Sequence, residues 1–156
     1  MNASTCCFTG HRNLPADKIE YIIKRLHDEI DNLIRQGVTD FISGGALGFD
    51  LIAASMVVSK KEMWEGIRLI FALPCRNQHA FWSVEQKRLY HALLREADEI
   101  RYISEEYSPD CMKKRNRYMA QHSGYCICAL LHDKSGTAQT VRHARKKGLC
   151  IINVLL

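Results

Sequence analysis

Three glycines and a carboxylate fall within the stretch Ser43 to Asp50, SGGALGFD. Glycine in regular structure costs roughly 0.5–1 kcal/mol relative to alanine, so a cluster is expected where the backbone turns sharply or something approaches it closely. Gly44, Gly45 and Gly48 therefore either form a cradle for a phosphate group or let a helix pack tightly on a sheet. Asp50 lies in the first turn of the helix predicted to follow, where it either complements the helix dipole or contacts a ribose hydroxyl.

A second polar turn, HDKSGT at 132–137, lies at another predicted helix start. It offers Asp133, Lys134, Ser135, Gly136 and Thr137. The N–H groups of a first helical turn have no partner within the helix, and the dipole makes that end positive, so the turn suits a phosphate. Neither turn has the G-x-G-x-x-G spacing of dinucleotide-binding enzymes, and the chain has no G-K-S/T of a P-loop.

Two further predicted loops carry groups that suit an anion or a base. The run TGHR places Gly10, His11 and Arg12 after a predicted strand, where Arg12 could bind a phosphate bidentately. Trp82 lies beside Phe81 at the start of a predicted helix, where it would either stack on a base or close the core. Buried aromatic side chains are the commoner case. His79, just before them, is predicted to be a surface histidine, with a polar ligand contact as the alternative.

The basic run Lys113 to Arg117, KKRNR, either contacts phosphate groups or forms a solvated helix face. Arg115 and Asn116 are its candidates for ligand contacts. Over the whole chain, 22 Lys and Arg against 17 Asp and Glu give a formal net charge of +5. This excess mildly favours anionic partners but is small for a nucleic-acid-binding protein.

Strand and helix signals alternate along all 156 residues, with no linker, repeat or low-complexity tract. We expect one domain over 1–156 with an α/β, Rossmann-like three-layer sandwich: a mainly parallel sheet of about six strands with helices on both faces. The predicted strands are 5–10, 40–43, 67–74, 98–104, 125–131 and 150–156. The predicted helices are 15–34, 48–61, 81–97, 111–123 and 137–148. Ligands bind such sheets beyond the carboxyl ends of the strands, so the site is expected in the loops that follow them.

The seven cysteines form an odd set without C-x-x-C spacing. They are predicted to be small buried hydrophobes in a reducing compartment. Cys126 and Cys128 would share one strand face, where a metal ion or a vicinal disulfide is the alternative to core packing. The chain shows no signal peptide and no apolar run that could span a bilayer, so we expect a cytoplasmic protein with no membrane partner. No metal site is predicted.

The order of these motifs resembles a known group of proteins. FISGGALGFDLIAA at 41–54, followed by RNRYMAQHSGYCICALLHDKSGTAQTVRHARKKG at 115–148, resembles the Rossmann-like core of the DNA-processing protein A (DprA/Smf) family. That family has an S-G-G-A-x-G-x-D turn, an R-N-R helix start and an S-G-T/S turn before an alanine-rich helix. FTGHR and ALPCRNQHAFWS are more similar to YpsA, a small single-domain member of the same SLOG superfamily. The resemblance covers almost the whole chain.

This resemblance implies a Rossmann-like fold whose glycine turns hold a nucleotide, a nucleotide derivative or nucleic acid. No other cofactor is expected, and the family likeness suggests a homodimer. The candidate ligand-binding residues are Gly10, Arg12, Ser43, Gly44, Gly45, Gly48, Asp50, Trp82, Arg115, Asn116, Ser135, Gly136 and Thr137.

For LOG enzymes of the superfamily, the resemblance would imply hydrolysis of a nucleotide N-glycosidic bond by an arginine and the glutamate of a P-G-G-x-G-T-x-x-E turn. Aligning that turn on Gly136 and Thr137 puts Thr140 at the glutamate, which removes the carboxylate needed to stabilise an oxocarbenium ion or activate water. Three hypotheses follow: a nucleotide-binding sensor or regulator, a hydrolase in which Asp50 or Asp133 is catalytic, and single-stranded DNA binding like that of DprA. The last ranks below the others because the charge excess is small.

Overall fold

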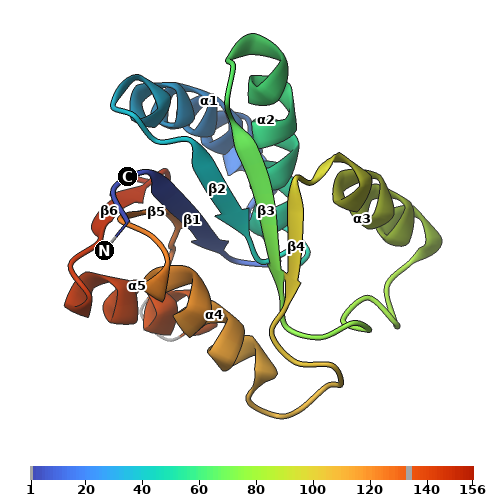
Figure 1. Cartoon of the computed structure of the whole chain (residues 1–156). Helices are drawn as coiled ribbons and strands as arrows, with labels where there is room; N and C mark the ends of the chain where they lie inside the picture. The colour runs from blue at the N-terminus through green and yellow to red at the C-terminus, as the bar shows by residue number, and fades with distance from the viewer. Residues whose placement is uncertain (1, 133–134) are drawn as a thin grey trace.

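The computed structural model describes residues 2–132 and 135–156. Strands and helices alternate along the chain, as Figure 1 shows. In chain order the elements are β1 (Thr5–Gly10), a 3-10 turn η1 (Ala16–Lys18), α1 (Ile19–Arg35), β2 (Asp40–Ser43), α2 (Phe49–Met63), β3 (Arg68–Leu73), α3 (Val84–Glu96), β4 (Glu99–Tyr102), α4 (Cys111–Gln121), β5 (Tyr125–Ala129), α5 (Gly136–Lys146) and β6 (Cys150–Asn153).

The strands form one six-stranded sheet in the order β4-β3-β2-β1-β5-β6. All of its strand pairs are parallel, which confirms the predicted α/β class. The chain moves outward from β1 through β2 and β3 to β4, then returns to the other side of β1 with β5. The loops after β1 and β5 therefore diverge at the sheet's topological switch point, where open α/β sheets bind their ligands.

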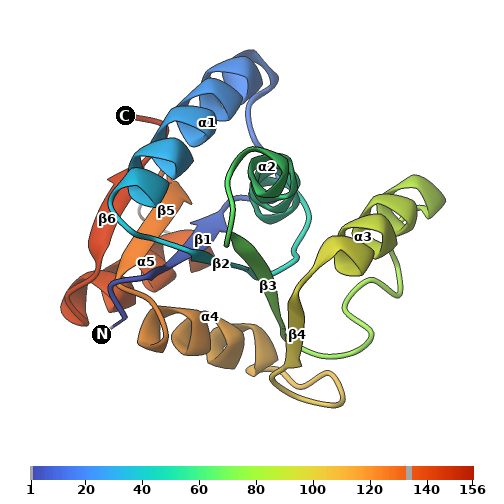
Figure 2. The same ribbon diagram turned by 45° about the horizontal axis from the view of Figure 1, so that its top comes forward.

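Helices cover both faces of the sheet, with α1, α2 and α3 on one side and α4 and α5 on the other (Figure 2). Side chains along a strand alternate between the two faces. Phe8 and Phe41 pack toward α1, α2 and α3, whereas their neighbours Cys7 and Ile42 pack toward α4 and α5. Because both faces are buried, the strand sequences are nearly continuous apolar runs.

Helix α3 begins at Val84, three residues later than the sequence predicted. Ser83 is its N-cap: the Ser83 hydroxyl accepts the Gln86 N–H at 3.1 Å, and the Gln86 side chain accepts the Ser83 N–H at 2.9 Å. This capping box satisfies two helix-end donors and sets the first turn. Phe81 and Trp82 consequently lie in the loop before the helix.

The cysteines follow the buried-hydrophobe prediction with one difference. All seven are free thiols, and all are buried except Cys150, which is exposed at the beginning of β6. Its position explains the difference, because β6 is the edge strand of the sheet. Within residues 2–132 and 135–156, none of the helices combines the length and the apolar character that crossing a membrane would need.

Candidate functional site

A cavity of about 360 Å³ lies at the switch point, and we refer to it as the switch-point cavity. Loops after β1, β2 and β5 contribute to it, together with the first two turns of α4. Eight of the predicted ligand-binding residues line it: Gly10, Arg12, Asp50, Arg115, Asn116, Ser135, Gly136 and Thr137. The remaining lining residues are Thr9, His11, Ala46 and Met112. Residues far apart in the sequence thus meet at one edge of the sheet.

Arg115 is one of the charged residues that line this cavity, and it is almost fully buried, with 5% of the residue exposed. Its Nε donates to Asn116 Oδ1 at 2.8 Å, one Nη donates to the Gly44 carbonyl oxygen, and the other contacts Met112 Sδ at 3.7 Å. A guanidinium has five N–H groups, so two remain without an acceptor among the described residues. Burial lowers the pKa of Arg115, an effect that Asp50 opposes, and the group stays protonated.

Asp50 is equally buried, with 5% of the residue exposed, and comes from the first turn of α2. Its Oδ2 accepts the Ala46 N–H at 3.3 Å. Burial raises the pKa of Asp50 to about 6, against the opposing effects of Arg115, the Ala46 N–H and Arg12. Among the described residues Asp50 is the only carboxylate that lines the cavity. Asp133, the other carboxylate of the hydrolase hypothesis, lies outside the described residues.

The raised pKa of Asp50 predicts that the free energy of unfolding depends on pH. The native state holds this proton up to pH ~6, whereas the unfolded chain releases it near pH ~3.9, so the contribution of Asp50 to stability falls as the pH rises between these values. Relative to Asp50→Asn, which does not titrate, the wild type should lose up to about 3 kcal/mol of unfolding free energy between pH 4 and pH 7. Urea denaturation of both proteins across this range measures the difference. Parallel pH profiles would contradict the raised pKa.

The glycine-rich turn after β2 is closed by its own hydrogen bonds. Ser43 Oγ donates to the Asp50 carbonyl oxygen at 2.9 Å and accepts the Gly45 N–H at 3.2 Å. A Cβ on Gly45 would lie 2.7 Å from Leu73, and one on Gly48 would overlap the backbone of the loop after β1. Both glycines thus accommodate close packing within the protein.

Several predicted residues lie outside the switch-point cavity. Ser43, Gly44 and Gly45 do not line it, although the Gly44 carbonyl oxygen accepts a hydrogen bond from Arg115. Gly48 instead lines a separate cavity of about 460 Å³ between α2 and α3, which Arg12 also borders.

Trp82 also lies away from the cavity, in an aromatic cluster between α3 and the loop before it. Its ring centroid is 5.1 Å from that of Tyr90 and 6.3 Å from that of His79. Trp82 thus packs against the core, as in the second of the two alternatives for this residue, and not as a platform for a base. His79 is half-buried rather than a surface residue, because its ring packs at 4.8 Å against Tyr90.

The amino end of α5 forms the opposite wall of the cavity. Ser135 is the N-cap, with its Oγ accepting the Ala138 N–H at 3.0 Å. A Cβ on Gly136 would have no neighbour within 4 Å among the described residues, so this residue borders open space. Thr140, at the position of the glutamate of LOG enzymes, donates its hydroxyl to the Gly136 carbonyl oxygen at 2.9 Å.

His11 also lines the cavity; the sequence analysis named it in this loop but did not include it among the candidate ligand-binding residues. Its Nε2 accepts the Leu131 N–H at 3.0 Å, and its ring stacks on His132 at 4.7 Å. Burial and the nearby His132 lower the pKa of His11. The neutral ring thus ties the loop after β1 to the loop after β5 across the switch point. Among the described residues, no group of three or more His, Cys, Asp or Glu is placed to hold a metal ion.

The all-parallel sheet and the position of the cavity define the protein as a Rossmann-like α/β domain. The model of the YspA SLOG family matches residues 6–148, and the chain belongs to that family. It is 34% identical over 139 residues to YoqJ, an uncharacterized SPbeta prophage-derived protein of Bacillus subtilis, with 78% of this chain and 81% of YoqJ covered. It is 30% identical over 131 residues to a UPF0398 protein of Halalkalibacterium halodurans, with 83% and 69% covered.

Solved structures of DNA processing protein A share the fold. The protein from Helicobacter pylori, described for its single-stranded DNA binding mode, aligns with a TM-score of 0.65 at 20% identity. The protein from Streptococcus pneumoniae aligns with a TM-score of 0.67 at 18% identity. Each alignment covers 94% of this chain, which spans 63% and 48% of the length of those two chains. The predicted resemblance to the SLOG superfamily is confirmed, and the resemblance to DprA is confirmed for the fold.

Proposed function

We propose that the switch-point cavity binds the phosphate group of a nucleotide or a nucleotide derivative, and that the protein acts through this site as a sensor or regulator. The observation that carries the proposal is the buried Arg115, which lines the cavity with two N–H groups left without an acceptor among the described residues. A buried cation with unused donors is costly unless an anion completes its hydrogen bonding. The first turn of α5, on the facing wall, adds further N–H donors and a positive dipole end.

The proposal predicts that nucleotides stabilise the fold and that Gly136→Leu prevents this. Gly136 faces open space and has no left-handed backbone, so a side chain there would enter the cavity without disturbing the core. A ligand at 100 times its dissociation constant stabilises a protein by about 2.7 kcal/mol. A thermal-shift panel of AMP, ADP, ATP, NAD, ADP-ribose and cyclic nucleotides should give a hit in the wild type, with at least ~10-fold weaker binding to Gly136→Leu.

Ser59→Leu is the matched control, since it adds an exposed leucine in the second half of α2, away from the cavity. We expect it to bind the hit like the wild type. No shift with any nucleotide, or equal affinity for a folded Gly136→Leu protein, would contradict the proposal.

Single-stranded DNA is the second candidate ligand, favoured by the shared fold with the Helicobacter pylori protein described for that activity. A strand would place its phosphates in the same cavity and extend beyond it. Binding would then weaken steeply with salt, because each neutralised phosphate releases counterions. A mobility shift with oligonucleotides at low salt supports this candidate over a free nucleotide if mononucleotides do not compete.

A further inference from the structure

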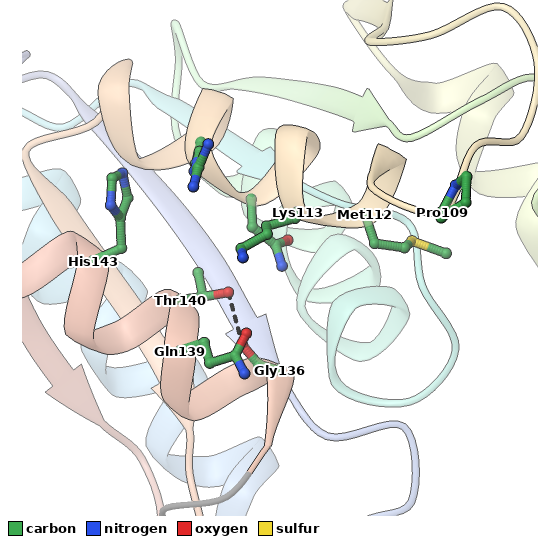
Figure 3. A pocket seen from close by; sticks show the side chains of 9 residues that line it. Pro109, Met112, Lys113, Gly136, Gln139, Thr140 and His143 are labelled. Carbon is green, nitrogen blue, oxygen red and sulfur yellow. Dashed lines mark hydrogen bonds between the residues drawn. The ribbon is translucent and has the colours of Figure 1, made fainter.

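A second cavity lies between α4 and α5, and Figure 3 shows the side chains that line it. It has a volume of about 270 Å³, and we name it the α4–α5 groove. Met112, Asn116 and Gly136 line both cavities, so the two adjoin. The phosphate site at Arg115 leaves this groove unused.

The groove is positively charged along α4. Lys113 and Arg117 lie one turn apart on this helix, and both line the groove. In Figure 3 Lys113 reaches from α4 toward α5. Neither cation forms an ion pair with a described residue, whereas the adjacent Lys114 pairs with Asp110 at 3.6 Å. Because no Asp or Glu is among its lining residues, the groove favours an anion.

The α5 side of the groove adds an unsatisfied polar atom. His143 Nε2 is buried and has no hydrogen-bond partner among the described residues. Burial lowers the pKa of His143, as do the charges of Lys147, Arg117 and Lys146, so the ring is neutral at pH 7. A buried polar atom without a partner is costly, and rotation of the ring toward the groove would let a ligand satisfy it. At the other end, Pro109 and Met112 offer an apolar surface of the kind that a nucleobase contacts.

We propose that the α4–α5 groove holds a second phosphate-bearing nucleotide unit, so that the ligand is a dinucleotide or a longer chain and not a mononucleotide. This inference rests on the proposed function of the switch-point cavity. The first phosphate lies at Arg115 and Gly136, and the ligand then continues past Asn116. The phosphate of the second unit lies between Lys113 and Arg117.

The test compares the dissociation constants of AMP and of the 5′-phosphorylated dinucleotide pApA by calorimetry. The wild type should bind pApA at least ~10-fold more tightly than AMP. The double variant Lys113→Ala/Arg117→Ala should lose this advantage while its affinity for AMP stays within ~2-fold. Both side chains are exposed, so the variant is expected to fold normally. The control Lys24→Ala/Lys114→Ala removes the same charge from positions outside the groove and should keep the advantage.

Equal binding of AMP and pApA to the wild type would overturn the inference while leaving the phosphate site intact. An equal loss in the control would also overturn it, because general charge would then explain the effect. If neither AMP nor pApA binds, the proposed function fails instead. A 5′-phosphorylated strand of about ten nucleotides identifies the source of the second unit. Affinity like that of pApA indicates a small dinucleotide, and tighter binding indicates a nucleic-acid strand; both support the groove.

Discussion

Gly48→Ala is expected to lower the free energy of unfolding by at least about 3 kcal/mol. Gly48 has φ of +84°, which side-chain-bearing residues rarely adopt. A Cβ there would also overlap the Arg12 carbonyl oxygen and lie 2.6 Å from that of His11. These are backbone atoms, and His11 is held by the Phe49 N–H, which donates to its carbonyl oxygen at 3.2 Å. Urea denaturation of the variant measures the loss.

Gly66→Ala separates the two causes of this effect. Gly66 has φ of +78°, close to that of Gly48, but a Cβ there would meet nothing within 4 Å among the described residues. Its substitution should cost only the backbone strain, about 1–2 kcal/mol. Equal losses in the two variants would show that the contact between Gly48 and the loop after β1 contributes nothing.

Arg115→Met is expected to have the second large effect, on both binding and stability. Methionine fills much of the same volume but supplies no donor, so affinity for the nucleotide hit should fall about 100-fold. The buried Asp50 carboxylate would also lose its opposite charge. Removing one partner of a buried charge pair typically costs 3–5 kcal/mol, and we expect a loss of about 3 kcal/mol at pH 7. Calorimetry and urea denaturation measure the two effects.

Two further variants test this explanation. Asp50→Asn added to Arg115→Met should recover part of the lost stability, because it removes the uncompensated charge. Arg117→Met, two residues away but exposed, should change stability by no more than ~0.5 kcal/mol. Strictly additive losses in the double variant would show that Asp50 and Arg115 do not interact.

The positions of the strands and helices could be predicted from the sequence because both faces of the sheet are covered. Runs such as 67–74 are apolar at nearly every position, and the helices between them carry one apolar face. The strand order could not be predicted in this way, since nothing in the apolar pattern indicates that β5 returns beside β1. That order, not the elements themselves, brings the loops after β1 and β5 together.

The late start of α3 was recognisable from the sequence, because Ser83 and Gln86 have the spacing of a capping box. The burial of Arg115 could also have been inferred. Cys111, Arg115 and Met119 recur every four residues, and all three are buried on one side of α4. An arginine in an apolar stripe indicates a buried cation, which the basic composition of the segment concealed.

The roles of the glycines could not be read from the sequence. Gly48 and Gly136 are the same residue type in similar turns, yet one faces a carbonyl oxygen and the other faces open space. The difference depends on which loop lies opposite, and therefore on the strand order. The homodimer and the cytoplasmic location stay predictions.

Cys150 has a practical consequence, because six of the seven thiols are buried and this one is exposed. The native wild-type protein should react with a maleimide as a single-thiol protein, without prior removal of the other cysteines. The label would mark the amino end of β6. The switch-point cavity lies beyond the carboxyl ends of the strands, so it would stay free for ligand. The labelling rates of the six buried thiols would then report the rates of local opening, since each becomes reactive only when the fold around it opens.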